Sequence, residues 1–310
     1  MIVWLGLLNI SKAQEYNVWM YSGMGMDFNT EPPTSYNSTL ANWNTQQASV
    51  SDEKGNLLFY TGQAFELRKF SILDRKQNII SPAEPAWHGF AGNRFNNILI
   101  KANDSIYYLF HIAPYDNPKG LGLFYTKINR KLNNGLGGLV PFEKEINFYP
   151  LPCVGLSVCM NADSSWWLVT RSYDSLLCFK IDKTGITGPV STYARENLFP
   201  AYYVAPFVNP DDCIMRFSHD GTFMVSMIDL PEIFSKTTFF RQTTFHTYSF
   251  DKISGKFFSQ YLVELDTANM GSVQRYRDIV FSPNDSLFYV SYSNKKNRDL
   301  LVQFERFNTD

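Results

Sequence analysis

The chain has 310 residues and a formal net charge of −1, and aromatic residues make up 16% of it. Charged residues make up only 18%, so the chain carries enough apolar surface to offset the entropy of ordering, and extensive disorder is excluded. The near-neutral charge argues against a nucleic-acid-binding protein, which usually needs a basic face, and because no run of 18 apolar residues occurs, no transmembrane helix is expected.

The first 14 residues, MIVWLGLLNISKAQ, form an apolar run followed by a short polar stretch. Ser11 and Ala13 stand where small residues precede a signal-peptidase site. We therefore predict a signal peptide over residues 1–14 and an exported protein, although no Lys or Arg precedes the apolar run. The alternative is that this run forms a first buried strand.

The chain has four cysteines: Cys153, Cys159, Cys178 and Cys213. They contain no C-x-x-C pair, so no zinc site is expected. In an exported protein a disulfide between Cys153 and Cys159, the nearest pair, is one alternative. Buried free thiols are the favoured interpretation, because a free cysteine packs as a small apolar side chain.

Beyond the N-terminal segment, short apolar runs alternate with polar turns, as expected of short strands. Only DLPEIF at 229–234 suggests a helical turn. One pattern recurs, in which a turn rich in Asp, Asn, Ser or Gly precedes a run of aromatic and aliphatic residues. Its copies are SDEKGNLLFYT (51–61), KANDSIYYLFHI (101–112), MNADSSWWLVTRS (160–172), FSHDGTFMVSMI (217–228) and FSPNDSLFYVSYS (281–293). A second strand follows most copies and shares an aromatic residue near its end, at Tyr125, Phe179, Phe250 and Phe304.

A repeated unit of several short antiparallel strands is typical of a propeller blade, since stacked sheets bury faces that one sheet leaves open. We predict an all-β protein with a β-propeller of four-stranded antiparallel blades over residues 15–310. Five hairpins are visible, and weaker strands between 65 and 100 are expected to add a further blade; an incomplete ring and a β-sandwich are the alternatives. The blade turns are predicted at Asp52, Gly55, Asp104, Asp163, Asp220, Gly221 and Asp285, with Asp52 and Gly55 as the first and last residues of a type I turn.

Two stretches have the composition of recognition surfaces, which are rich in aromatic residues and Arg. AEPAWHGFAGNRFNN at 83–97 supplies Trp87, His88 and Arg94. QRYRD at 274–278 places Arg275, Tyr276 and Arg277 directly before a predicted strand, on one face of the propeller. These six residues are the ligand-binding candidates. The alternative for the first stretch is a connecting loop whose aromatic side chains pack inward.

An enzyme site is not expected. The four histidines, His88, His111, His219 and His246, show no metal or catalytic spacing, and no G-x-S-x-G motif occurs. Paired carboxylates would be needed for glycoside cleavage. Asp27 is the best single acidic candidate, and Asp211 with Asp212 is an adjacent acidic pair, but a turn role is favoured for Asp27 and a loop-capping role for the pair. Polar turns such as NPDD and SPNDS offer oxygen ligands, so calcium is kept as a weak alternative to having no cofactor or metal.

The opening of the chain also resembles a known family. WMYSGMGMDFN at 19–29 and the hairpin SDEKGNLLFYT, together with LNNGLGG at 132–138 and FSPNDSLFYVS at 281–291, are similar to the propeller domain of exported surface proteins of Bacteroidetes. Those proteins are gliding-motility-associated or type IX secreted. The resemblance implies a tryptophan-aspartate-repeat-like propeller of seven blades, with six as the alternative, without catalytic residues, and further domains C-terminal to it in a longer parent chain.

These observations together predict a non-catalytic propeller module on the outside of the cell or the outer-membrane surface, without membrane insertion. Its partner would be a protein or a glycan, and nucleic acid is not expected. Two alternatives stay open: a propeller hydrolase acting on glycans or peptides, and an intracellular scaffold.

Overall fold

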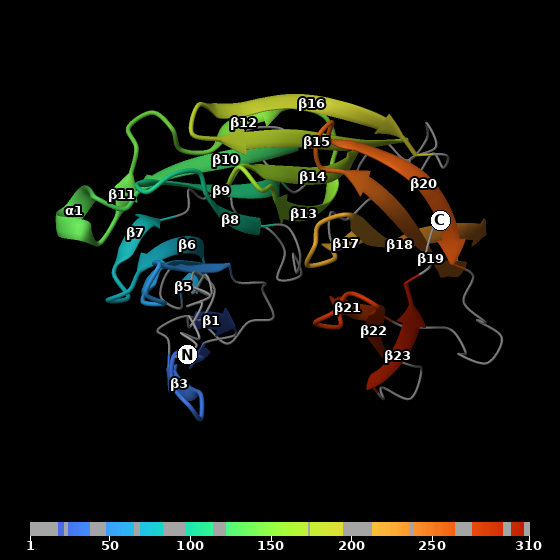
Figure 1. Ribbon diagram of the computed structural model, residues 1–310, viewed down its shortest axis with the longest axis horizontal. Helices are drawn as coiled ribbons and strands as arrows, with labels where there is room; N and C mark the ends of the chain where they lie inside the picture. The colour runs from blue at the N-terminus through green and yellow to red at the C-terminus, as the bar shows by residue number, and fades with distance from the viewer. Residues whose placement is uncertain are drawn as a thin grey trace, which may run out of the picture. The chain divides into compact units, whose positions relative to one another are not determined.

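The computed structural model describes residues 18–21, 24–37, 48–64, 69–82, 97–113, 122–172, 174–194, 213–235, 238–263, 275–293 and 299–306. They form an all-β, six-bladed propeller of mainly four-stranded antiparallel sheets (Figure 1). The predicted fold class is therefore confirmed, with six blades rather than the expected seven. The proposed signal peptide, residues 1–14, lies outside the described residues.

The sheets are numbered here in chain order. Sheet 1 contains β1 (Val18–Tyr21), β2 (Met24–Asp27) and β3 (Thr34–Asn37). Sheet 2 contains β4 (Ser49–Ser51), β5 (Leu57–Ala64), β6 (Lys69–Asp74) and β7 (Ile79–Pro82). Sheet 3 contains β8 (Asn97–Lys101), β9 (Ile106–Ala113), β10 (Gly122–Asn129), β11 (Gly138–Leu139) and β12 (Ile146–Tyr149). A single helical turn, α1 (Leu132–Gly135), precedes β11.

The last three sheets follow the same plan. Sheet 4 contains β13 (Val154–Met160), β14 (Trp166–Ser172), β15 (Ser175–Asp182) and β16 (Gly185–Tyr193). Sheet 5 contains β17 (Cys213–Phe217), β18 (Phe223–Ser235), β19 (Thr238–Asp251) and β20 (Lys256–Val263). Sheet 6 contains β21 (Arg275–Phe281), β22 (Leu287–Ser293) and β23 (Asp299–Glu305). Within each of these sheets, every strand pairs with the next along the chain.

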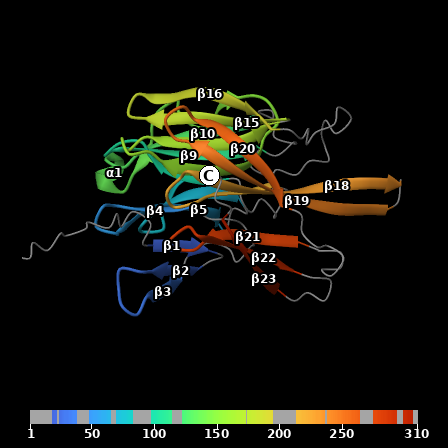
Figure 2. The same ribbon diagram turned by 45° about the vertical axis from the view of Figure 1, so that its right-hand side comes forward.

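Two predictions about elements are wrong. The strands between 65 and 100 do not add a blade: β6 and β7 complete sheet 2, and β8 begins sheet 3. DLPEIF is not helical, because residues 229–233 continue β18 and pair with residues 239–243 of β19. The run TTFFRQTTF (237–245) is rich in β-branched and aromatic residues and offers this segment a partner strand. Figure 2 shows β18 and β19 as a long two-stranded ribbon.

The chain separates into two compact units. Residues 1–83 and 130–138 form the first, which holds sheets 1 and 2; its core contains Val18, Met20, Tyr60 and Leu73. Residues 84–129 and 139–310 form the second, which holds most of sheet 3 and all of sheets 4, 5 and 6.

Large apolar side chains fill the space between successive sheets of the second unit. Between sheets 3 and 4 they include Phe110, Leu168 and Phe179. Between sheets 4 and 5 they include Val169, Met215, Tyr248 and Phe250. Between sheets 5 and 6 they include Val225, Phe245, Phe288 and Val290. Each such side chain contributes roughly 1.5–3 kcal/mol on burial, so these interfaces hold neighbouring blades together.

The four cysteines belong to this packing. All of them are buried and none forms a disulfide, which confirms the favoured interpretation over the Cys153–Cys159 bridge. Burial raises the pKa of the Cys153 and Cys159 thiols to about 12, so both stay protonated and unreactive in the folded protein.

Candidate functional site

The two ends of the sheets in the second unit differ in what they expose. At one end, which we call the turn face, the first strand of each sheet turns into the second, at residues 102–105, 161–165, 218–222 and 282–286. Contacts across neighbouring sheets show that these turns lie together: the Trp166 indole N–H donates to the Lys101 carbonyl over 2.9 Å, and the Trp167 indole N–H donates to the Lys252 carbonyl over 2.7 Å. At the opposite end, the strand-start face, β8, β13, β17 and β21 begin.

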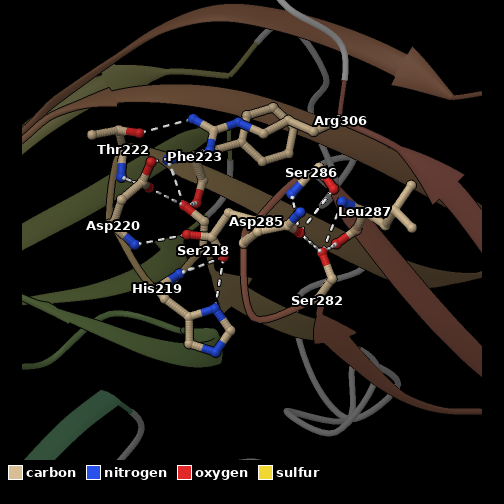
Figure 3. A network of polar contacts seen from close by, with 11 residues as sticks. Ser218, His219, Asp220, Thr222, Phe223, Ser282, Asp285, Ser286, Leu287 and Arg306 are labelled. Atoms are coloured by element: carbon tan, nitrogen blue, oxygen red, sulfur yellow. Dashed lines mark hydrogen bonds and ion pairs between the residues drawn. The ribbon is translucent and has the colours of Figure 1, made fainter.

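On the turn face, a network of polar contacts joins sheets 5 and 6 (Figure 3). The carboxylate of Asp285, which is buried, accepts the backbone N–H groups of His219 and Asp220 over 2.9 Å each. His219 Nδ1 also lies 2.7 Å from Asp285 Oδ1, and because a carboxylate only accepts, Nδ1 carries the proton. Asp285 thus joins the turn of one blade to the turn of the next.

Asp220 connects the same network to Arg306, the residue directly after β23. Its carboxylate accepts from the Ser218 hydroxyl over 2.6 Å, the Thr222 backbone N–H over 2.9 Å and Arg306 over 3.0 Å. Partial burial alone would raise the pKa of Asp220, but these hydrogen bonds outweigh it and hold the pKa below its usual range. Arg306 also lies over the Phe223 ring, 5.0 Å from its centroid.

The other predicted turn residues also lie between first and second strands. Asp52 and Gly55 form the turn between β4 and β5, where the Gly55 N–H donates to the Asp52 carbonyl over 2.9 Å, as in the expected type I turn. Asp163 accepts the Ser165 backbone N–H. In the turn that contains Asp104, however, the neighbouring Asn103 is the acceptor, for the N–H groups of residues 105 and 106.

The turn carboxylates therefore have a visible structural role. SPNDS was one of the two turns considered for calcium. In this turn the Asn284 side chain accepts the Ser286 N–H, and the Asp285 carboxylate accepts the backbone N–H groups of His219 and Asp220 in the neighbouring turn. The other named turn, NPDD, and the pair Asp211 and Asp212 lie outside the described residues. Within the described ranges, no group of three or more His, Cys, Asp and Glu side chains could hold a metal ion.

Asp27 has the turn role that was favoured for it. Its carboxylate accepts both the backbone N–H and the side-chain amide of Asn29, over 2.8 Å each. The same Asn29 amide donates to the Gly55 carbonyl over 2.8 Å. Asp27 thus fixes the end of β2 and orients Asn29 against the turn between β4 and β5.

The strand-start face holds three of the ligand-binding candidates. Arg275, Tyr276 and Arg277 do not precede the strand, as predicted, but form the first residues of β21. Arg275 pairs with Ser293 and Tyr276 with Tyr292, and the register then shifts between Tyr276 and Asp278. Arg277 is therefore the extra residue of a β-bulge, a feature that redirects a side chain and is common next to functional sites.

The other three candidates are Trp87, His88 and Arg94. They lie outside the described residues, in the segment 83–96 that leads into β8. The described part of the chain therefore places only Arg275, Tyr276 and Arg277 of the six candidates.

The bulge in β21 has a counterpart in sheet 4. There the register shifts between Val154 and Leu156, which makes Gly155, with a φ of 65°, the extra residue. In both sheets a hydroxyl from the second strand reaches the bulge: Thr170 Oγ1 donates to the Gly155 carbonyl over 2.9 Å, and Ser291 Oγ to the Asp278 carbonyl over 3.5 Å. At equivalent positions sheet 4 therefore carries no side chain, and sheet 6 carries an arginine.

Basic side chains also lie on the first strands and on strands farther out in the sheets. Arg216 of β17 pairs with Asp278 of β21 over 2.9 Å. In the second strand of sheet 4, Arg171 is fully buried and donates to the Tyr248 hydroxyl over 3.4 Å, and His246 in the third strand of sheet 5 is also fully buried. Sequence reasoning missed Arg171. The repeat could have indicated it, because WWLVTRS has an Arg at the position where the other copies have Met227 (FMVSMI) and Tyr292 (LFYVSYS).

The described elements thus define a class of protein, a six-bladed β-propeller. No family model and no curated protein matches the sequence. Among solved structures, the chain is similar to a protein from Lactobacillus plantarum, with 11% identity, a TM-score of 0.50, and coverage of 94% of this chain and 80% of that one. Among the described residues, no helix is long and apolar enough to cross a membrane.

Two enzymes are among the other similar structures. The periplasmic gluconolactonase of Pseudomonas aeruginosa has 11% identity and a TM-score of 0.47, with coverage of 93% of this chain and 78% of that one. The endo-arabinase of Bacteroides thetaiotaomicron has 14% identity and a TM-score of 0.42, with coverage of 86% and 95%. Because the identities are this low, the similarity of the chain to bacterial propellers is distant and concerns the fold alone.

Proposed function

We propose that this protein is an exported β-propeller module that binds a protein or glycan at the cell surface through its strand-start face. The observation that carries the proposal is the position of Arg275, Tyr276 and Arg277 at the start of β21, with Arg277 in the bulge. Arg and Tyr are enriched at the centres of binding surfaces, because they combine a large contact area with directional hydrogen bonds.

Three further observations support the proposal. The chain carries Trp87, His88 and Arg94 in AEPAWHGFAGNRFNN, a stretch with the composition of a recognition surface. The apolar run at residues 1–14 has the form of a signal peptide. The motifs around residues 19–29 and 51–61 resemble the propellers of exported Bacteroidetes surface proteins, for which a binding role without catalysis is expected.

The test is a binding screen with the purified full chain against a glycan array and a panel of extracellular matrix proteins. We expect saturable binding to at least one probe. Replacing Arg275 and Arg277 together by Ala should weaken this binding at least about tenfold, as for central interface residues.

The matched control removes the same charge from the turn face. Lys180→Ala with Lys252→Ala should leave the affinity unchanged, since these side chains contact Asp163 and the Asp220 carbonyl there. Equal losses in the two double variants, or no saturable binding to any probe, would refute the proposal. Breakdown of a probe glycan by the unaltered protein would replace it with the hydrolase alternative.

A further inference from the structure

The segment that links β10 to β11 contains the motif LNNGLGG, residues 132–138. Within it, Asn134–Gly135 is the single Asn–Gly pair of the chain. An asparagine side chain can react with the backbone nitrogen of the next residue. Glycine favours this reaction, because it has no Cβ to shield that nitrogen and its backbone takes up many conformations. The sequence alone therefore singles out the amide of Asn134 among the asparagines of the chain.

The structure leaves the side chain of Asn134 accessible. Asn134 is exposed, and within the described ranges no hydrogen bond involves its side chain. Other turn asparagines differ in this respect: Asn56 and Asn78, which precede β5 and β7, donate their amides to Asp52 and Asp74 over 3.0 Å and 2.9 Å. The fold holds those amides in place and leaves the amide of Asn134 free to turn toward its own backbone.

The backbone next to Asn134 has room to move. Ring closure brings the Gly135 nitrogen to the side-chain carbon of Asn134, so the peptide between the two residues must rotate away from the left-handed values of Asn134, φ 56° and ψ 38°. Gly135 has a φ of +81°, and apart from its chain neighbours no atom of the described residues lies within 4 Å of the position of an added Cβ. Packing around Gly135 therefore does not oppose the rotation, and glycine takes up either sign of φ.

We propose that Asn134 is a site of covalent self-modification, at which it is converted into aspartate and isoaspartate. The Gly135 nitrogen, deprotonated by hydroxide, attacks Asn134 Cγ; a C–N bond forms, the Cγ–Nδ2 bond breaks, and Nδ2 takes up a proton and leaves as ammonia. The product is a five-membered cyclic imide. Water then opens the imide, at the Cγ–N bond to give aspartate or at the backbone C–N bond to give isoaspartate.

The modification acts on a segment that packs on sheet 2. Residues 130–138 belong to the first compact unit, where Arg130 forms an ion pair with Glu53 over 3.2 Å. Farther along the segment, a Cβ on Gly137 would lie 2.3 Å from the ring of Phe59. The backbone of Gly137 is therefore in close contact with a buried aromatic side chain of sheet 2.

Three hydrogen bonds close the turn around residue 134. The Leu136 N–H donates to the Asn133 carbonyl over 3.1 Å, and the Gly137 N–H donates to the Leu132 carbonyl over 3.0 Å. The Asn133 amide donates to the Gly137 carbonyl over 2.8 Å. Isoaspartate lengthens the main chain by one carbon inside all three rings, so it weakens these bonds and the contact with sheet 2. None of these residues takes part in the proposed function, so the inference does not rest on it.

The test follows each asparagine of the purified full chain during incubation in warm, mildly alkaline buffer. Peptide mapping by mass spectrometry measures the fraction of asparagine that becomes aspartate or isoaspartate. We expect Asn134 to convert at least about tenfold faster than Asn133, which corresponds to a barrier about 1.4 kcal/mol lower. Asn133 is the internal control, because it is exposed in the same turn and also has a left-handed φ, of 52°, but its amide is hydrogen-bonded.

Two variants test the chemistry. Gly135→Ala should slow the conversion of Asn134 at least about tenfold, because the methyl group shields the attacking nitrogen. Asn134→Gln keeps an amide at this position, but its longer side chain must close a larger and slower-forming ring. This variant should therefore accumulate no acidic form at residue 134. Thermal melts establish that both variants remain folded.

A further comparison separates the lengthened main chain from the added charge. The isoaspartate form, isolated by ion exchange, should unfold at a lower temperature than the fresh protein. Asn134→Asp carries the same charge on an ordinary main chain and should unfold close to the temperature of the fresh protein. Equal shifts in the two forms would contradict the effect assigned to the longer main chain.

Three results would overturn the assignment of the site. One is equal conversion of Asn133 and Asn134 in the folded protein. Another is conversion of Asn134 only in denaturant, which would show that the turn protects it. The third is an unchanged rate at Asn134 in Gly135→Ala, which would show that the attack does not come from the nitrogen of residue 135.

Discussion

At the scale of single residues, short polar side chains fix the blade turns. Asp52, Asp163, Asp182 and Asp251 each accept the backbone N–H of the residue two positions later. This local bond holds the turn whatever the sheet packs against. Asp285 departs from the rule, since its carboxylate accepts the N–H groups of the neighbouring blade and leaves its own turn to Asn284.

The turn at Gly55 gives the first prediction. Gly55 has a φ of +84°, and a Cβ there would lie 2.0 Å from the Asn29 side-chain oxygen. Gly55→Val therefore adds a collision to the strain of a left-handed backbone, which costs about 1–2 kcal/mol for an ordinary residue. The variant should unfold at a clearly lower temperature than the unaltered protein.

The matched control is Gly135→Val. Gly135 has a φ of +81°, close to that of Gly55, but nothing lies within 4 Å of its added Cβ. Denaturant unfolding should show a loss of free energy at least about 1 kcal/mol larger for Gly55→Val, the typical size of a single-site defect. Equal losses would mean that the collision with Asn29 does not contribute to the loss of stability.

Asp220 gives a prediction about pH. Its pKa in the folded protein lies below the ordinary value of 3.8, so the ionised carboxylate stabilises the fold above that value. This stabilisation is lost as the pH falls below 3.8 toward the folded pKa. Asp220→Asn should therefore lower stability at pH 7 and show a smaller further loss on acidification, measured by urea unfolding at pH 7 and pH 3.

Asp163→Asn is the control for this experiment. Hydrogen bonds from Ser165, with a smaller effect from Lys180, lower the pKa of Asp163 to about 2. Asp163→Asn should therefore also lower stability at pH 7, as Asp220→Asn does. The Asp163 carboxylate is exposed, and its partners among the described residues, Ser165 and Lys180, belong to its own sheet. Solvent screens such pairs. Its effect should be smaller than that of Asp220, and the reverse order would contradict the assigned role of the network between sheets 5 and 6.

At the scale of elements, two adjacent tryptophans of β14 join sheet 4 to both of its neighbours. Successive residues of a strand point to opposite faces. Trp166 accordingly packs in the cluster shared with sheet 3, and Trp167 packs in the cluster shared with sheet 5. Each indole N–H donates to a backbone carbonyl of the sheet on its own side. The pair WW is therefore a connection between blades.

We predict that Trp167→Phe lowers the free energy of unfolding by about 1–3 kcal/mol, the cost of leaving a buried polar group without its hydrogen bond. The Lys252 carbonyl loses its donor, and the smaller ring also contacts Phe250 less well. Tyr193→Phe, in the same sheet but 68% exposed, should change stability by less than about 0.5 kcal/mol. Chemical denaturation of both variants tests this, and similar losses would refute it.

The hairpins were predictable from the sequence, but the number of blades was not. The turn chemistry around Asp52 and the alternation of aromatic residues are local signals, and the structure has strands at all five copies of the pattern. The blade count depends on how many strands pair in one sheet. Local sequence did not show that β6 pairs with β5 and β7 to complete sheet 2, nor that DLPEIF pairs with β19.

The candidate site was predictable only in part. Arg275, Tyr276 and Arg277 were selected as candidates by composition, because aromatic and arginine side chains gather at binding surfaces. The bulge at Arg277 depends on the register between β21 and β22, which no residue in QRYRD reveals. Asp285 and Arg171 were not recognised as links between sheets, since their partners lie 66 and 77 positions away in the chain.

At the scale of the whole molecule, the packing between sheets protects the thiols. Cys153, Cys159, Cys178 and Cys213 are buried, and burial raises the pKa of Cys178 above its usual range as well. We predict that a thiol reagent labels none of them in the native protein and all four in denaturant. Labelling should follow global unfolding, and rapid labelling of the native protein would contradict the burial of these residues.

The pairing of consecutive strands within a sheet affects how the chain folds. Every strand pairing in sheets 4, 5 and 6 joins strands that are consecutive along the chain, so each blade can form from one continuous segment without waiting for distant residues. Local pairing of this kind lowers the entropy cost of loop closure and speeds folding. A chain that crosses a membrane unfolded, N-terminus first, could therefore assemble its blades one after another as it emerges.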